Sequence, residues 1–239
     1  MPMRPLSSGE NPTDKTRGDT GVAGNERLTA LTGSVLLVLF AVEIVTVILL
    51  RALMPAHFFV GVLLIGPVAV KSASTGWRFL RYYSRHPAYR RKGPPGPAMR
   101  ALAPLLLAST LAVIGSGIAL AFTGPAPAVL VRVHVISFLF WLVLIVVHVA
   151  AYAARVPKLI RQDWPQRAAP PPPGRWARLA VNIAALVGAG IAAFFLLPTA
   201  SPWAGWPEQE VSGFGLLAVI VIATTVMVAA ARRRRRRLR

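Results

Sequence analysis

Long apolar runs alternate with short polar segments along the chain, and six of these runs are each close to twenty residues long. A helix of about 20 apolar residues crosses the hydrocarbon core of a bilayer, and it satisfies its own backbone hydrogen bonds there. The pattern therefore predicts an all-α membrane protein with six transmembrane helices. The expected spans are 28–50, 54–75, 101–122, 128–154, 177–197 and 211–231.

The polar segments predict how these spans are grouped. Residues 1–27 are polar, with proline, glycine and both charge signs, which favours a disordered tail before a retained first anchor. Proline-rich loops at 90–100 and 165–176 indicate stiff, extended spacers. The expected organisation is a tail (1–27), a four-helix membrane bundle (28–155), a proline-rich linker (156–176), a two-helix membrane hairpin (177–231) and a polybasic tail (232–239).

Positive charge is concentrated in alternate connecting segments. Seven cations follow the second span: Arg78, Arg81, Arg85, Arg90, Arg91, Lys92 and Arg100. Five follow the fourth span: Arg155, Lys158, Arg161, Arg167 and Arg175. The chain ends RRRRRRLR. The loop at 123–129 has no charge, and the loop before the sixth span has only Glu208 and Glu210. By the positive-inside rule we expect a multi-pass inner (plasma) membrane protein with both termini cytoplasmic.

Composition narrows the functional classes. The chain has 239 residues, of which 55% are hydrophobic, so one membrane bundle without a separate soluble domain is expected. The net charge of +19 does not indicate nucleic-acid binding, because the cations lie at the ends of spans; the terminal arginines predict contact with anionic membrane lipid instead. The absence of cysteine excludes disulfides, cysteine-ligated iron–sulfur clusters and covalent c-type haem.

Three of the four histidines lie inside predicted spans, where ionisable side chains are costly and usually functional. His134 and His148 share one span, fourteen residues apart, so their rings leave nearly the same helix face about 21 Å apart. His57 and His134 are expected at similar depth near the outer leaflet, where two imidazoles on neighbouring helices can ligate one haem iron. His148 is expected at the depth of Lys71, near the inner leaflet.

This histidine pattern resembles the bacterial cytochrome b superfamily, meaning the b561-like and the hydrogenase or formate dehydrogenase cytochrome b subunits, over roughly residues 28–155. The resemblance implies a four-helix bundle that holds haem b between His57 and His134. His148 matches one ligand of a second, inner haem, but Lys71 stands where its other ligand would be. The implied function is an electron-transfer subunit, rather than a stand-alone enzyme, between the quinone pool and a partner oxidoreductase.

Several neighbouring residues fit a haem pocket. Gly61, one turn from His57, leaves room for a flat macrocycle, and Arg51 and Arg132 near the outer surface are suited to pair with haem propionates. Further residues with room for the ring, or with aromatic groups to pack on it, are Gly115, Gly117, Phe58, Phe138 and Trp141.

Structural roles are open for the same residues. A buried histidine can hydrogen-bond to a neighbouring helix, glycines can pack helices, and arginines can snorkel to the interface. Glu43, the only acid within the spans, fits a proton path, a quinone hydrogen bond, a partner of the outer site, or a neutral acid bonded to another helix. The alternative function is a haem-free multi-span membrane protein, either a small transporter or an assembly or anchor subunit.

Overall fold

The computed structural model describes residues 12–94, 96–152, 155–163, 173–204, 206 and 224, and every element in these ranges is helical. Five helical stretches are long and apolar enough to cross a membrane: Thr20–Ile48, Leu50–Tyr83, Pro97–Thr123, Ala128–Tyr152 and Arg175–Trp203. They coincide with the first five expected spans, so the all-α class is confirmed, and the five stretches are consistent with a multi-pass membrane protein. The sixth expected span, apart from Thr224, and the polybasic tail lie outside the described residues.

The first antiparallel pair consists of α1 (Pro12–Ile48) and α2 (Leu50–Tyr83), joined by a turn at Leu49. Leu53 leaves helical geometry (φ −116°, ψ 22°) just before Pro55, because a proline ring clashes with the preceding turn of a regular helix. Apolar residues of the two helices interlock midway along the pair: Leu36, Leu39, Phe40, Phe59, Val60, Leu64 and Val68.

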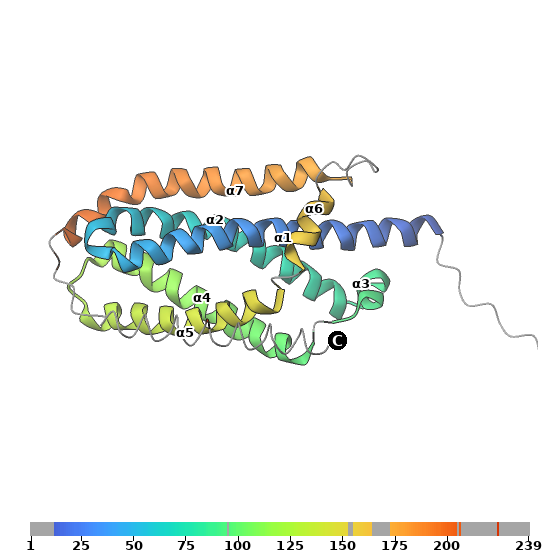
Figure 1. Cartoon of the computed structure of the whole chain (residues 1–239), viewed down its shortest axis with the longest axis horizontal. Helices are drawn as coiled ribbons and strands as arrows, with labels where there is room; N and C mark the ends of the chain where they lie inside the picture. The colour runs from blue at the N-terminus through green and yellow to red at the C-terminus, as the bar shows by residue number, and fades with distance from the viewer. Residues whose placement is uncertain are drawn as a thin grey trace, which may run out of the picture.

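The second antiparallel pair consists of α4 (Pro97–Thr123) and α5 (Ala128–Tyr152), and Gly124 ends α4 at a positive φ of 68°. Helix α7 (Arg175–Leu196) packs along α2 and continues into the 3-10 helix η1 (Leu197–Trp203). Figure 1 shows α1, α2 and α7 on one side of the molecule and α4 and α5 on the other. The α1–α2 turn, the α4–α5 turn and η1 lie at one end, which we call the η1 end.

Residues 12–27 correct the expectation of a disordered tail, because α1 begins at Pro12. Val22 packs in a small buried cluster with Ala88 and Tyr89 of α3 (Pro87–Lys92). The first proline-rich spacer also differs from expectation, since α3 includes its residues 90–92. Helix α6 (Val156–Asp163) opens the segment expected as a linker and packs on α1. Polar helical segments of this kind are stabilised by tertiary partners that local composition does not reveal.

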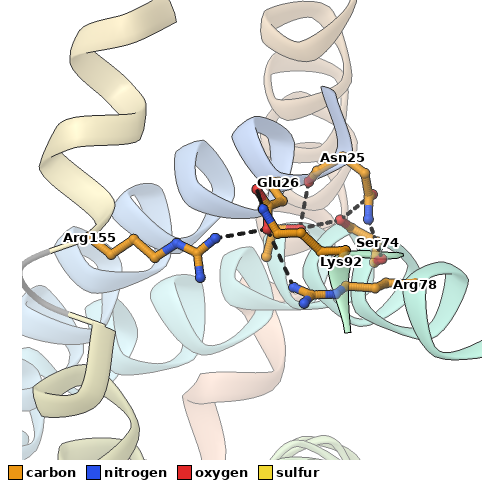
Figure 2. Close-up of polar contacts among 7 residues, drawn as sticks. Asn25, Glu26, Ser74, Arg78, Lys92 and Arg155 are labelled. Atoms are coloured by element: carbon orange, nitrogen blue, oxygen red, sulfur yellow. Dashed lines mark hydrogen bonds and ion pairs between the residues drawn. The ribbon is translucent and has the colours of Figure 1, made fainter. Parts of the chain in front are cut away.

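An ionic cluster connects the N-terminal part of α1 to three other segments (Figure 2). The Glu26 carboxylate, only 11% exposed, is paired with Arg78 of α2 at 3.7 Å, Lys92 of α3 at 3.0 Å and Arg155 before α6 at 2.9 Å. The preceding Asn25 donates to the Ser74 carbonyl at 3.1 Å and accepts from its hydroxyl at 2.8 Å. We call Glu26 and its three cations the Glu26 cluster.

Replacing Glu26 with glutamine is expected to lower the free energy of unfolding by roughly 1–2 kcal/mol, between the values for exposed and for buried ion pairs. The substitution keeps the shape of the side chain but leaves three cations without a counter-charge. Thermal unfolding of the detergent-purified protein measures the effect, which should shrink at high salt because part of the cluster is exposed to solvent.

Arg78→Gln is the matched control for that experiment, since it removes the longest of the three contacts and leaves Glu26 with two cations. It should lower stability less than Glu26→Gln does. Equal stability of Glu26→Gln and the unmodified protein at low salt would show that the cluster contributes nothing to the fold.

Candidate functional site

His57 on α2 and His134 on α5 face one another across the bundle. Their ring centroids are 6.3 Å apart and the ring planes are inclined by 76°. The two residues are 77 positions apart in the numbering, and the topology expected from the loop charges placed them at one depth. The structure therefore brings together the two residues that the sequence analysis singled out as a ligand pair.

The His57 ring is held by two polar residues of α1. Its Nδ1 lies 2.9 Å from Oε1 of Glu43, whose side chain is 13% exposed, and 3.4 Å from the Thr46 hydroxyl. The Thr46 hydroxyl donates to the other Glu43 carboxylate oxygen at 3.0 Å and is itself buried. A carboxylate only accepts, so this contact favours the tautomer of a neutral His57 ring with the proton on Nδ1 and the lone pair on Nε2.

The His134 ring is held in the same way by α4. Its Nδ1 donates to the carbonyl oxygen of Val113 at 3.1 Å and lies 3.0 Å from the Ser116 hydroxyl. A carbonyl oxygen also only accepts, so here too Nε2 carries the lone pair. Gly117 makes room for this ring, since a Cβ there would lie 3.1 Å from His134 Cε1. The space at Gly117 thus serves the imidazole itself.

Both Nε2 atoms lack a hydrogen-bond partner within the described ranges. Histidines that ligate metals usually donate their other ring N–H to a carboxylate or a backbone carbonyl, as these two do. Bonds from a metal to imidazole nitrogen are about 2 Å long and each nitrogen is about 1 Å from its ring centre, so two axial ligands have centroids roughly 6 Å apart. Two neighbouring imidazoles with this hydrogen-bond pattern are a donor set that iron accepts from a protein.

The number of ligands distinguishes haem from a bare ion. In the part of the chain that the structure describes, no group of three or more histidine, cysteine or acidic side chains is arranged to hold a metal. Haem iron receives four nitrogens from its macrocycle and needs only axial ligands from protein. In addition, α2 and α5 have little direct contact with each other.

The three residues predicted to adjoin a haem, Gly61, Arg51 and Arg132, do not lie together in the structure. Gly61 adjoins the acid, since a Cβ there would lie 3.5 Å from Oε1 of Glu43. Arg51 and Arg132 are exposed near the η1 end of α2 and α5. Gly61 is therefore part of the α1–α2 contact at the site, whereas the two arginines are at the surface.

Lys71 and His148 each lie fourteen residues after one histidine of the pair, so they are expected at one level of the bundle. The Lys71 ammonium donates a hydrogen bond of 2.6 Å to the Thr29 carbonyl of α1. The His148 ring lies 5.0 Å from that of Tyr152. This level therefore holds one imidazole and a lysine that is already engaged with the backbone, unlike the pair at the other level.

The predicted aromatic residues separate into two groups. Trp141 is buried, donates from Nε1 to the Thr110 hydroxyl at 3.0 Å, and packs on Phe40 at 4.7 Å and on Phe138 at 6.2 Å. Phe58, which follows His57, lies 6.0 Å from the Trp203 ring of η1. Trp141 thus belongs to the core between α1, α4 and α5, whereas Phe58 belongs to the η1 end.

Thr46, Ser116 and the Val113 carbonyl were missed from the sequence. Thr46 lies three residues after Glu43, a spacing that places both on one helix face, so this signal was available. Ser116 is a polar residue within an apolar span, but its partner depends on how two helices pack. No family model, curated protein or solved structure matches the chain, so these residues carry the functional argument themselves.

Proposed function

We propose that this protein is an integral membrane b-type cytochrome, in which His57 and His134 ligate one haem b through their Nε2 atoms. One observation carries the proposal. Each ring has its Nδ1–H held by an acceptor, Glu43 or the Val113 carbonyl, while Nε2 is left without a hydrogen bond among the described residues. Two rings held in this way, with centroids 6.3 Å apart, support a shared ligand bound through both Nε2 atoms.

The surrounding residues would orient the ligands and adjust their basicity. Glu43 fixes the tautomer of His57 and makes that ring the stronger electron donor, because a carboxylate polarises the ring more than a neutral carbonyl does. The Val113 carbonyl fixes the tautomer of His134, and Ser116 limits rotation of the ring. Bound haem would supply one-electron chemistry, and the apolar bundle around it would exclude water.

Only one haem per chain is proposed. Fourteen residues after His57, the position that would match His148 holds Lys71, whose ammonium is bonded to the Thr29 carbonyl, so a second pair of imidazoles is not formed. Because the site lies near one end of the membrane helices, we propose electron exchange between the membrane quinone pool and a partner oxidoreductase on the outer side. This step follows from the resemblance to bacterial cytochrome b subunits.

The proposal is tested by the optical spectrum of the full chain, purified in mild detergent from a haem-replete host. We expect a b-type spectrum that sharpens on reduction, with about one haem per chain by extraction assay. Monodisperse, helical protein without haem would contradict the proposal and favour the haem-free alternative, a small transporter or an assembly or anchor subunit.

A further inference from the structure

The 3-10 helix η1 covers the end of the bundle nearest the histidine pair. It continues directly from α7 and packs against α2 and α4, at the end where α1 turns into α2 (Figure 1). Pro202 closes onto the α4–α5 turn, since a Cβ at Gly124 would lie 3.5 Å from its own Cβ. Trp203, the last residue of η1, lies against Phe58, the residue that follows His57.

Trp203 carries a buried donor. The residue is 6% exposed, and its Nε1 has no hydrogen-bond partner among the residues that the structure describes. Trp141, which is 5% exposed, shows the usual arrangement, with Nε1 donating to the Thr110 hydroxyl. A buried donor left unpaired costs about 1–3 kcal/mol, and each such group in a folded protein needs an explanation.

The surroundings of this donor indicate the kind of acceptor that it meets. An indole N–H only donates, so its partner is an oxygen or another acceptor atom. The Phe58 and Trp206 rings lie 6.0 Å and 5.1 Å from the Trp203 ring, so an incoming group must combine an apolar body with an acceptor. Haem has this character, because its apolar macrocycle carries two propionate carboxylates along one edge.

We infer that Trp203 Nε1 donates a hydrogen bond to a propionate carboxylate of the haem that His57 and His134 ligate, and that η1 forms the wall of this site. The inference rests on the proposed function. It places the propionate edge toward the η1 end, which also carries the exposed cations Arg51 and Arg132. A charge-assisted hydrogen bond to a carboxylate would satisfy the otherwise unpaired indole.

The test replaces Trp203 with phenylalanine in the full chain, which removes the N–H and keeps an aromatic ring. We expect haem to be retained, its midpoint potential to fall, and the propionate bending band in the resonance Raman spectrum to shift. The potential falls because a propionate without its donor keeps more negative charge near the iron and stabilises the ferric state. Trp176→Phe is the matched control, since this tryptophan lies at the start of α7, far along the chain from η1, and is 74% exposed, and it should leave both readouts unchanged.

The outcomes separate this inference from the proposed function. Haem-containing Trp203→Phe with an unchanged potential and an unchanged propionate band would overturn the inference alone, whereas unmodified protein without haem would overturn the proposed function. If Trp203→Phe loses haem, Trp203→His restores a ring N–H and is expected to recover binding. Failure of that recovery would also contradict the inference.

Discussion

Replacing either His57 or His134 with alanine is expected to remove haem from the purified protein. The two rings come from α2 and α5 and are proposed as the axial pair, so neither helix offers a substitute at that level. Haem occupancy should fall by more than about tenfold, because even loss of an outer-shell partner of a metal ligand commonly lowers metal affinity by 10–100-fold. The haem-to-protein absorbance ratio, measured after size-exclusion chromatography, gives the occupancy directly.

His148→Ala is the matched control for these variants. His148 is also a histidine within α5, but it lies beside Tyr152 and at the level of Lys71. Its removal should leave the haem content and the reduced spectrum unchanged. Loss of all haem from His148→Ala, in protein that stays monodisperse and helical, would show that the proposed ligand pair is wrong.

The meeting of His57 and His134 could be predicted from sequence because it depends on few quantities. The loop charges set the direction of each span, the length of a membrane helix sets where it begins, and the rise per residue sets depth. His57 and His134 each lie near the start of a span that runs in the same direction. Depth alone therefore placed them together, without any knowledge of side-chain packing.

The groups that hold the two rings could not be predicted in this way. Whether Glu43 reaches His57 or Arg51 depends on the rotation of α1 against α2, which the turn at Leu49 and the non-helical Leu53 set. The bond from His134 to the Val113 carbonyl requires α4 and α5 to pack with a particular rotation and offset. Depth follows from a count along the chain, but rotation about the helix axis follows from packing.

The helical segment at 12–27 shows a second limit of sequence reasoning. Its polar composition favours disorder only if its charges find no partners in the fold. Glu26 finds Lys92 and Arg155, which lie 66 and 129 positions further along the chain. Such distant pairs leave no trace in local composition. For this reason the composition of residues 1–27 predicts disorder throughout the segment.

Replacing Gly66 with alanine is expected to separate α7 from α2 and to lower the free energy of unfolding by roughly 1–3 kcal/mol or more. A methyl group at this position would overlap the carbonyl oxygen of Ala185 and lie 2.9 Å from its carbonyl carbon and 3.0 Å from Ala189 Cβ. Small residues allow this close approach of two helix backbones, as in many membrane helix pairs. Because the clash is with backbone, rotation of a side chain cannot relieve it. Thermal unfolding in detergent measures the loss.

Gly188→Ala on α7 is the matched control, since an added methyl there has no neighbour within 4 Å. Alanine favours helix over glycine, so this variant should be as stable as the unmodified protein or slightly more stable. Because η1 continues from α7, the Gly66 variant should also disturb the haem spectrum through Trp203, whereas the Gly188 variant should not. Equal stability of the two variants would contradict the close packing of α7 against α2 at Gly66.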